Sequence, residues 1–351
     1  MNLQMVRKKI DLLDSRIVKL LNNRMELALM ARRLKTRVED SKRENEILKR
    51  IQENATGLVH GELMEKLYEE ILRESKNLQK KDYRLLAFHG EHGSYGEVAA
   101  REWNEDLIPM PCTELVDLFE GIQSGLYDFG IVPVENTLGG VVGQINEFLI
   151  QADLYVVGAV ELPIHHCLLA LPGTDHRELR MVYSHSQALA QCRQFLSRNN
   201  LEPSPYYNTA AAAKMLSENR PKAAAVIASS LCADLYDLEI IKENIEDFDR
   251  NITRFLVLSG KENQEEGKKC SIIFSTEDKA GILFKVLEVF ANRNINLTRI
   301  ESIPKSPGNY AFFLDFIGSD RDENIKGAVE EVKSMTTTFK LVGCYKERTV
   351  S

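Results

Sequence analysis

The sequence contains no run of eighteen or more apolar residues, although hydrophobic residues make up 44% of its 351 positions. A membrane-spanning helix needs about 20 consecutive, mostly apolar residues, so we expect none in this chain. The amino terminus, MNLQMVRKKIDLLDS, becomes charged at once and lacks the apolar core of a secretion signal. These absences predict a globular protein that acts in the cytoplasm and has no membrane partner.

Cysteine is also sparse, and its six residues stand singly along the chain: Cys112, Cys167, Cys192, Cys232, Cys270 and Cys344. None forms a CxxC pair, so the spacing indicates neither a zinc site nor a disulfide framework. A reduced, cytosolic setting fits this pattern best. We therefore expect neither a metal site nor a disulfide framework.

The net charge of −7 is divided unevenly along the chain. Residues 1–82 carry 19 Lys and Arg against 14 Asp and Glu, whereas the remainder carries 26 against 38. A mildly basic first segment can attract small anions or nucleic acid, although a solvated helical surface is the ordinary meaning of such an excess. We find neither a helix-turn-helix spacing nor a basic patch interleaved with aromatic residues, so we expect no nucleic-acid partner.

Residues 1–80 show the apolar spacing of helices. In the first segment this spacing joins Val6, Ile10, Leu13, Ile17, Leu20, Leu27, Ala31 and Leu34. No Gly or Pro interrupts them, which predicts one helix of more than thirty residues, and further helices are expected at about 41–53 and 61–79. A core built from so few helices is thin, so we expect a homodimer or a larger homo-oligomer.

The pattern changes at 80–82. Short apolar runs then alternate with helical segments, which is typical of an α/β domain. A polar linker follows at 261–269, and residues 270–345 show the strand and helix order of a ferredoxin-like fold. We therefore predict a multidomain chain: an all-α domain of three helices at 1–82, an α/β domain at 83–260, and a linker with an α+β ferredoxin-like domain at 261–351.

Eight polar residues of the helical segment are candidates for one site: Arg7, Arg24, Lys35, Asp40, Arg43, Glu44, Ser75 and Gln79. Arg24 and Lys35 are eleven residues apart, about three helical turns, so they share a face. Arg7 precedes Lys35 by 28 residues, or about 42 Å along a straight helix, which no side chain spans. If both serve one ligand, Arg7 must come from a second protomer. Taken singly, each of the eight is more simply a surface residue on a helix.

These residues carry a resemblance to the all-helical chorismate mutases, through VRKKIDLLDSRIVKLLNNRMELA, the lysine of RRLKT, the DSKRE cluster and ESKNLQ. The resemblance implies that chorismate rearranges to prephenate without a nucleophile, metal or cofactor, in a dimer whose sites each borrow an arginine. Arg7 and Arg24 are expected to bind the two carboxylates, and Lys35 and Gln79 to donate to the ether oxygen. Glu44 is expected to bind the ring hydroxyl. Supporting roles fall to Asp40, Arg43 and Ser75.

Five motifs mark the α/β segment: GEHGSYGEVAA (90–100), VPVENTLGG (132–140), YSHSQALAQC (183–192), NTAAAA (208–213) and NITRF (251–255). A glycine turn before a helix can hold an anion on its backbone N–H groups, although alone it is an ordinary strand–helix turn. Together the motifs resemble the prephenate dehydratase family across 84–260. The resemblance implies two α/β lobes, each with its own sheet, and a site in the cleft.

Prephenate loses carbon dioxide and its ring hydroxyl together, so a donor must sit at the departing hydroxyl. The resemblance assigns this role to Thr253, and it adds Glu135, Asn136 and Gln191 as catalytic residues. The expected substrate-binding residues are Ser94, Thr137, Ser184, His185, Thr209 and Ser229. Ser186 stands where the family usually has proline. LPIHHCLLALPG and SQALAQC also resemble plant arogenate dehydratases, so arogenate stays open as a substrate, and the fused mutase favours prephenate.

Residues 270–345 resemble an ACT domain, an amino-acid-binding regulatory module. The resemblance places its phenylalanine-binding blocks at GILF and ESIP, between two domains of a dimer. The expected effector-binding residues are Gly281, Ile282, Leu283, Phe284, Glu301 and Ser302. Ile303 stands where the family usually has arginine. A domain kept only for dimerisation is the simpler alternative.

Together these resemblances imply a bifunctional enzyme of phenylalanine biosynthesis, an isomerase and a lyase in one chain, inhibited by phenylalanine and needing no cofactor. Two other classes stay open. A solute-binding module shares the two-lobed architecture but normally carries an export signal. A non-catalytic regulator would combine the helical arm with a ligand-sensing ACT domain.

Overall fold

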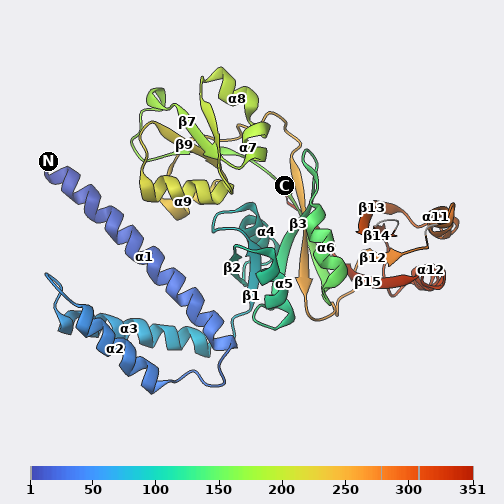
Figure 1. Ribbon diagram of the computed structural model, residues 1–351, viewed down its shortest axis with the longest axis horizontal. Coiled ribbons are helices and arrows are strands. Elements are labelled where there is room, and N and C mark those ends of the chain that lie inside the picture. The colour runs from blue at the N-terminus through green and yellow to red at the C-terminus, as the bar shows by residue number, and fades with distance from the viewer. Residues whose placement is uncertain (1, 278, 307–308, 351) are drawn as a thin grey trace. The chain divides into compact units, whose positions relative to one another are not determined.

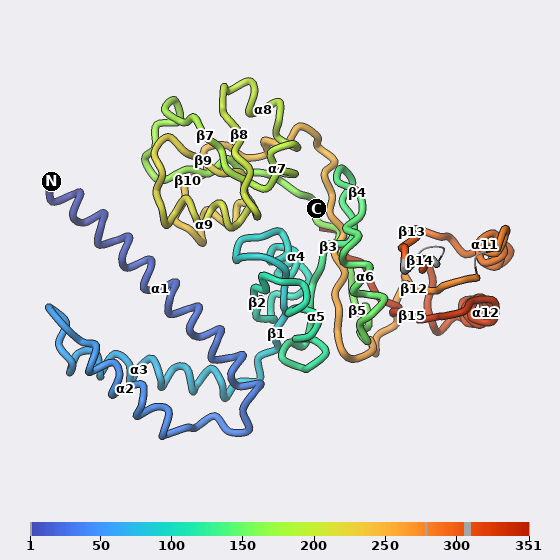
Figure 2. The backbone as a smooth tube through the Cα atoms, viewed as in Figure 1, coloured from blue at the N-terminus to red at the C-terminus, as the bar shows by residue number. Residues whose placement is uncertain are grey.

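The computed structural model describes residues 2–277, 279–306 and 309–350, and Figures 1 and 2 show its elements and its backbone path. The chain divides into two compact units, Met1–Arg84 and Leu85–Ser351. The first unit is helical, and the second combines α/β lobes with a separate sheet and its helices. The predicted multidomain fold is confirmed.

The helices of the first unit are α1 (Leu3–Arg33), α2 (Ser41–Asn54) and α3 (Gly61–Lys80). Short polar side chains satisfy the free N–H groups where α1 and α2 begin. Asn2 accepts a hydrogen bond from the Met5 amide at 2.9 Å, and Asp40 accepts one from the Arg43 amide at 3.0 Å. These caps explain why the helices start where the sequence predicted.

The apolar stripe of α1 is only partly covered within one copy of this unit. Leu29 is the residue of α1 that is buried, and Leu72 is its buried apolar counterpart on α3. Towards the amino terminus, Leu13 and Leu20 remain 56% and 68% exposed. An exposed stripe of this length is costly in water, so the first unit has a surface that fits a further helix.

The first lobe of the second unit is built on a sheet with the order β16-β5-β11-β3-β1-β2, and β4 pairs with β3. Its strands are β1 (Leu85–His89), β2 (Ile108–Cys112), β3 (Phe129–Asn136), β4 (Gly140–Val141), β5 (Tyr155–Pro163), β11 (Ile252–Ser259) and β16 (Glu347–Thr349). Its helices are α4 (Tyr95–Trp103), α5 (Leu115–Gln123) and α6 (Gly143–Gln151). The antiparallel register of β11 and β3 sets Thr253 opposite Asn136. Two motifs far apart in sequence therefore meet at one end of this sheet.

The second lobe has its own sheet, with the order β10-β6-β9-β7-β8. Its strands are β6 (Cys167–Ala170), β7 (Met181–Ser184), β8 (Glu202–Pro205), β9 (Ala224–Ala228) and β10 (Glu239–Lys242). Its helices are η1 (His176–Glu178), α7 (Ser186–Gln191), α8 (Arg193–Arg198), α9 (Thr209–Asn219) and α10 (Leu231–Tyr236). The chain enters this lobe after β5 and leaves it before β11, so two crossing segments join the lobes. The two-lobed prediction is confirmed.

The third sheet has the order β13-β14-β12-β15 and is antiparallel throughout. Its strands are β12 (Lys269–Ser275), β13 (Leu297–Ser306), β14 (Asn309–Ile317) and β15 (Thr338–Tyr345), and its helices are α11 (Ile282–Asn292) and α12 (Glu323–Ser334). Phe274, Phe290 and Phe316 are fully buried in its core. This is the ferredoxin-like arrangement that the sequence predicted. After β15 the chain leaves this sheet, and β16 pairs with β5 of the first lobe.

A buried ion pair joins the third sheet to the first lobe. Arg254 of β11 bonds to Asp315 of β14 at 2.6 Å and to Glu347 of β16 at 2.5 Å, and it donates to the Tyr345 hydroxyl at 2.9 Å. Arg254 is 7% exposed and Asp315 is fully buried. Burial alone would lower the pKa of Arg254, but Tyr345, Asp315 and Glu347 raise it overall, so it stays charged. Because neighbours on a strand point to opposite faces, Thr253 and Arg254 serve different faces of one sheet.

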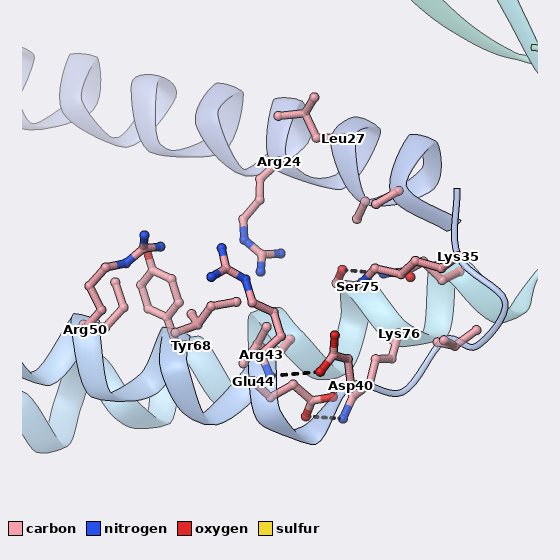
Figure 3. A pocket seen from close by; sticks show the side chains of 17 residues that line it. Arg24, Leu27, Lys35, Asp40, Arg43, Glu44, Arg50, Tyr68, Ser75 and Lys76 are labelled. Atoms are coloured by element: carbon pink, nitrogen blue, oxygen red, sulfur yellow. Dashed lines mark hydrogen bonds and ion pairs between the residues drawn. The ribbon is translucent and has the colours of Figure 1, made fainter. Parts of the chain in front are cut away.

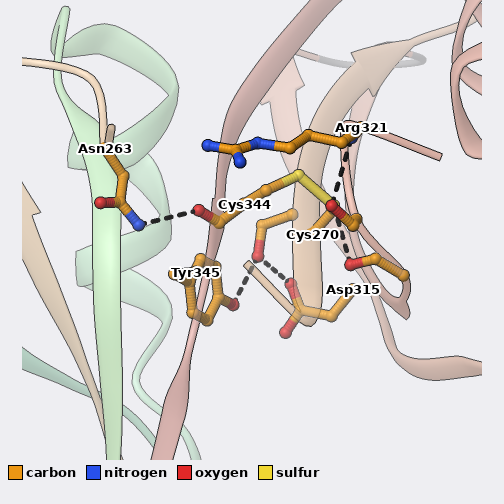
Figure 4. Close-up of a disulfide and its surroundings, with 9 residues drawn as sticks. Asn263, Cys270, Asp315, Arg321, Cys344 and Tyr345 are labelled. Atoms are coloured by element: carbon orange, nitrogen blue, oxygen red, sulfur yellow. Dashed lines mark hydrogen bonds between the residues drawn. A yellow bond between two sulfur atoms is a disulfide. The ribbon is translucent and has the colours of Figure 1, made fainter. Parts of the chain in front are cut away.

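One expectation about cysteine is wrong. Cys270 of β12 and Cys344 of β15 form a disulfide, although they lie 74 residues apart in the sequence. The two residues are direct cross-strand partners, with Cα atoms 4.1 Å apart, which spacing in sequence does not reveal. Figure 4 shows the bond close to Tyr345 and Asp315. The remaining cysteines, Cys112, Cys167, Cys192 and Cys232, are free and buried.

Over the residues that the structure describes, no helix is both long enough and apolar enough to cross a membrane.

Candidate functional site

The first unit contains a cavity of about 520 Å³, lined by α1, α2, α3 and the connection before α2. Seven of the eight predicted residues line it: Arg24, Lys35, Asp40, Arg43, Glu44, Ser75 and Gln79. Figure 3 shows Arg24 reaching from α1 toward α2, with Arg50 and Tyr68 on one side of it and Lys35 and Ser75 on the other. The structure therefore brings these seven side chains to one cavity.

The guanidinium of Arg24 is the feature of the pocket that most strongly indicates an anionic ligand. Arg24 is half-buried, and its Nη1 atom is buried without a hydrogen-bond partner among the described residues. A buried N–H donor without a partner is costly, so such an atom normally has an acceptor in the working state. A carboxylate matches the planar fork of a guanidinium, and this pocket can therefore bind a carboxylate.

The carboxylate of Glu44 is paired by a residue that the sequence did not single out. Lys76 of α3 bonds to Glu44 of α2 at 2.9 Å, and both line the pocket. Asp40 caps α2 through the Arg43 amide, and the Arg43 side chain lies 3.3 Å from Glu46. Glu44 is thus held between two helices, while Asp40 has a structural part in forming the pocket.

Ser75 and Gln79 are one helical turn apart on α3 and hydrogen-bond to each other at 3.2 Å. Both are buried, at 5% and 8% exposure, and the Gln79 Oε1 atom has no partner among the described residues. Buried polar groups normally have partners, so the free end of this amide is suited to a ligand.

Arg7 does not line the pocket formed within this chain. It lies near the start of α1, which runs without a break from Leu3 to Arg33. Lys35 lies beyond the end of α1, so the expectation that it shares a helical face with Arg24 is wrong. Arg7 is still far from the pocket end of α1, since 26 residues separate it from Arg33, or about 39 Å along the helix. One copy of the unit therefore cannot bring all eight predicted residues together.

The second unit contains a polar cluster where its two lobes meet, centred on Thr253. Asn136 Nδ2 donates to Thr253 Oγ1 at 2.9 Å and to Asn251 Oδ1 at 2.8 Å. The other end of the amide is fixed, because Asn136 Oδ1 accepts from the amides of Leu138 and Gly139. Since Thr253 Oγ1 accepts from Asn136, its own O–H is left to donate elsewhere.

The cluster continues across the lobe junction. Asn251 Nδ2 donates to Gln191 Oε1 at 3.0 Å, and the same oxygen lies 2.8 Å from Nε2 of His166. The Tyr95 hydroxyl lies 2.7 Å from Nδ1 of His166 and 2.8 Å from the carbonyl oxygen of His165. Gln191 belongs to the second lobe and Tyr95 to the first, so the network ties both lobes together.

The glycine-rich turn before α4 packs tightly against the second lobe. Gly93 has φ +87°, and a Cβ atom there would lie 2.5 Å from Cys232 Sγ, so only glycine fits. Ser229 donates to the Gly93 carbonyl at 2.6 Å, whereas Ser94 Oγ is buried without a partner among the described residues. Ser94 begins α4, where free N–H groups favour an anion. Of these two predicted serines, Ser94 is the better placed for a ligand.

The buried carboxylate of Glu97 holds this turn in shape. It accepts from the Gly93 amide at 2.8 Å and from Arg101 Nε at 3.0 Å, and it lies 3.1 Å from Nδ1 of His92. Burial would raise the pKa of Glu97, but the bonds to His92, Gly93 and Arg101 lower it overall. The ionised carboxylate therefore supports the loop that presents Ser94.

The other predicted residues of this unit differ in what they can offer. The Thr137 hydroxyl is bonded to backbone groups, because its Oγ1 donates to the Arg250 carbonyl and accepts from the Ile252 amide. Ser184 is fully buried and donates to the Ile227 carbonyl. Three others lie at the ends of elements: Glu135 is near the end of β3, His185 is the N-cap of α7, and Thr209 is the first residue of α9.

The predicted effector residues lie at the start of α11 and in β13. Gly281 is the N-cap of α11 with φ +83°, a conformation that glycine adopts without strain. Ile282 and Leu283 are partly buried, and Phe284 is 66% exposed. Glu301 bonds to Arg299 at 2.8 Å, and Ser302 is exposed. Ile303, which replaces the family's usual arginine, is buried at 5% exposure.

Three residues of the lobe junction escaped the sequence analysis: Tyr95, His166 and Asn251. All three lie in segments that the sequence marked, because Tyr95 belongs to GEHGSYGEVAA, Asn251 begins the NITRF motif and His166 lies in LPIHHCLLALPG. None of these segments says which side chain points toward the junction. Among the described residues, no group of three or more His, Cys, Asp or Glu side chains is arranged to hold a metal ion.

Family models match the chain in three consecutive segments. Chorismate mutase type II matches residues 6–80, prephenate dehydratase matches 86–263, and the ACT domain matches 271–334. The segments follow the two units and the third sheet in the order that the sequence predicted.

Similar proteins include a bifunctional chorismate mutase/prephenate dehydratase of Aquifex aeolicus (strain VF5), 34% identical over 98% of this chain and 97% of that protein. Arogenate dehydratase/prephenate dehydratase 2 of Arabidopsis thaliana is 38% identical over 74% of this chain and 72% of its own length. A prephenate dehydratase from Arthrobacter aurescens, solved in complex with L-Phe, superposes with a TM-score of 0.69 at 28% identity, over 75% of this chain and 89% of that chain. Since the first match spans both units and all three segments, the chain belongs to the family of bifunctional chorismate mutase/prephenate dehydratases with an ACT domain.

Proposed function

We propose that the first unit rearranges chorismate to prephenate. The substrate has two carboxylates, and the pocket offers the guanidinium of Arg24, whose Nη1 atom has no partner among the described residues, for one of them. The second carboxylate needs a further cation, for which Arg7 of a second protomer is the candidate. The exposed apolar stripe on α1 supports this dimer, because a partner's helix would cover it.

The rearrangement passes through a compact conformer in which an ether C–O bond weakens and its oxygen gains negative charge. Lys35 and Gln79 are the donors proposed for that oxygen. With its amide turned so that Oε1 accepts from Ser75, Gln79 presents Nε2 to the ligand and keeps the same internal bond. Glu44, held by Lys76, is placed for the ring hydroxyl. No bond to the protein forms, so positioning and electrostatics carry the reaction.

The second unit is proposed to convert prephenate to phenylpyruvate. The bond to the ring carboxylate breaks and releases carbon dioxide, its electron pair enters the ring, and the ring hydroxyl leaves as water after it gains a proton. Thr253 is the proposed donor to the departing oxygen of the substrate. Its own Oγ1 already accepts a hydrogen bond from Asn136, so its O–H hydrogen is directed elsewhere. Ser94 and the start of α4 are proposed to bind a carboxylate.

Prephenate is the proposed substrate rather than arogenate. The first unit supplies prephenate within the same chain, and the match that covers 98% of the chain is to a bifunctional mutase/dehydratase. The arogenate-type relative matches over a smaller share of the chain. Comparing kcat/KM for the two purified substrates tests this choice, and a larger value for arogenate would reverse it.

The third sheet and its helices are proposed to bind phenylalanine and to inhibit the dehydratase. The solved relative with bound L-Phe supports the ligand. Gly281–Phe284 of one protomer and Glu301–Ser302 of its partner are the proposed contacts, and the proposed setting is a cytoplasmic homodimer or larger oligomer. Phenylalanine then weakens the binding of a prephenate analogue by the same factor as the analogue weakens phenylalanine.

Seven predicted residues line one cavity, where the buried Nη1 atom of Arg24 has no partner among the described residues, and this observation carries the proposal. Incubation of the purified chain with chorismate tests it. We expect prephenate to form and phenylpyruvate to follow. A purified, folded chain that leaves chorismate unchanged would remove the mutase assignment.

A further inference from the structure

His166 lies on the first of the two segments that cross between the lobes, and it is almost completely buried at 2% exposure. Its ring packs edge-on against Tyr95, with centroids 5.6 Å apart. Its Nε2 atom lies 2.8 Å from Gln191 Oε1, and its backbone amide donates to Glu246 at 2.9 Å. A buried imidazole with both nitrogens bonded is a positioned group whose role the reaction scheme above leaves unassigned.

The hydrogen on Nε2 of His166 follows from a chain of bonds that starts at the backbone. Two backbone amides fix Asn136 with its nitrogen toward Asn251. Asn251 must then turn its oxygen to Asn136 and its nitrogen to Gln191, whose oxygen accepts. The same Gln191 oxygen can bond to His166 only if Nε2 of the ring carries a hydrogen. The anchored amide of Asn136 thus sets the orientation of Asn251, Gln191 and His166 in turn.

This arrangement fixes the direction of the Gln191 amide nitrogen. Its oxygen is held by two donors, so its two N–H groups point away from them, and they have no partner among the described residues. Burial lowers the pKa of His166 despite the bond to Gln191, so the ring is neutral near pH 7. With its hydrogen on Nε2, the neutral ring accepts at Nδ1, so the single hydrogen of the Tyr95 hydroxyl, 2.7 Å away, is donated to Nδ1.

We propose that His166 is a positioning residue of the dehydratase site, which holds the Gln191 amide with its nitrogen turned toward the substrate. The proposal rests on the prephenate dehydratase activity proposed above. The substrate of that reaction is rich in acceptor oxygens, two carboxylates and a carbonyl among them, and N–H groups match these. Without the His166 donor, Asn251 alone holds the Gln191 oxygen, so the amide rotates more readily and then presents its oxygen, which repels a carboxylate.

Two replacements of His166 in the full-length chain separate the donor from the shape of the ring. His166→Phe keeps an aromatic ring against Tyr95 but removes the N–H, and we expect kcat/KM for prephenate to fall by about 10–100-fold. His166→Gln carries an amide N–H on a chain of suitable length, and we expect it to stay within about fivefold of wild type. The neighbouring His165→Phe is the matched control, because its side chain is 56% exposed and bonds only to Glu246 among the described residues.

A double-mutant cycle with Gln191→Ala tests whether His166 acts through Gln191. The proposal predicts that His166→Phe has no further effect, within about twofold, once Gln191 is alanine. The proposal would be overturned if the fold-losses of His166→Phe and Gln191→Ala multiplied in the double variant. A His166→Phe enzyme as active as wild type would overturn it as well. A His166→Gln enzyme as impaired as His166→Phe would overturn it too, because the N–H would then be irrelevant. If the wild-type chain itself makes no phenylpyruvate, the proposed function fails first, and the two failures are distinguishable.

Discussion

At the scale of single residues, the Thr253 hydroxyl is the group on which the proposed dehydration depends most. Its oxygen accepts from Asn136, an amide that two backbone N–H groups hold in one orientation. Because the oxygen is occupied, the hydroxyl hydrogen is free to meet the departing oxygen of the substrate. This is a stronger reason for a catalytic role than the motif alone.

Replacing Thr253 by alanine is expected to lower the rate of phenylpyruvate formation by about 10²–10⁴-fold, the usual range for loss of a proton donor. Thr253→Ser keeps the hydroxyl and is the matched control, expected to retain most of the activity. Mutase activity should be unchanged in both, since the residue belongs to the second unit. A steady-state assay on chorismate and on prephenate separates the two steps. Equal loss of both activities would contradict the assignment.

Glu97 gives a prediction for pH at the same scale. Its pKa is lowered in the folded protein, so the stability it contributes is fully present above its unfolded pKa of about 4.5 and is lost as the pH falls through the folded value. We expect Glu97→Gln to lower the free energy of unfolding by about 2 kcal/mol at pH 7, because Gly93 and Arg101 lose a charged acceptor. Urea unfolding at pH 7 and pH 4 should show the gap to wild type narrowing in acid. A gap that stays constant or widens would count against this role.

At the scale of elements, sequence periodicity predicted most of the architecture. The helices of the first unit begin at capping residues and follow an uninterrupted apolar spacing, so local chemistry determines them. Strand β16 was not predicted, because the polar run KERTV shows no alternation and its partner β5 lies far away in sequence. The Cys270–Cys344 bond and the bonds of His166 were missed for the same reason, since both depend on tertiary register.

The candidate sites show the same difference between what local sequence predicts and what depends on tertiary contacts. Seven residues that line the pocket of the first unit were predicted because the family pattern identifies them, five of them on helices and two, Lys35 and Asp40, in the connection between α1 and α2. In the dehydratase, the motifs named the right segments, but Thr137 and Ser184 proved to be bonded within the backbone network. Which face of a strand or turn a hydroxyl occupies depends on the neighbouring segment, and one sequence does not contain that information.

The disulfide between β12 and β15 is expected to stabilise the third sheet. It closes a loop of 74 residues, for which about 2–4 kcal/mol is typical. Adding a phosphine reductant should therefore speed hydrogen exchange in β12 and β15, and the double variant Cys270→Ser, Cys344→Ser should exchange fast with or without reductant. Cys112→Ser removes a free buried cysteine and is the control that should still respond to reductant. Identical exchange in the oxidised and reduced wild type would show that the bond contributes nothing.

At the scale of the whole molecule, the proposed mutase site is expected to need a second copy of the chain. The pocket within one chain has Arg24 but lacks Arg7, and the amino-terminal half of α1 leaves Leu13 and Leu20 largely exposed. A partner that covers this stripe would bring its own Arg7 to the pocket. Dimerisation and catalysis are therefore expected to be lost together when the stripe is made polar.

Hybrid dimers test this shared site. Arg7→Ala and Arg24→Ala should each be inactive alone, since every site lacks one arginine. Unfolding and refolding the two variants together gives mixed dimers in which one site has both arginines and the other has neither. With random pairing, about one quarter of the wild-type mutase activity should return. Verified mixed dimers without any recovered activity would exclude a site built from two protomers.

The central claim is that one chain holds two separate active sites that act in sequence. The most direct test is a time course of chorismate, prephenate and phenylpyruvate with purified wild-type, Arg24→Ala and Thr253→Ala proteins. We expect the wild type to form phenylpyruvate, Thr253→Ala to stop at prephenate, and Arg24→Ala to leave chorismate unchanged while still converting added prephenate. Loss of both steps in either folded variant, or no phenylpyruvate from the wild type, would contradict the claim.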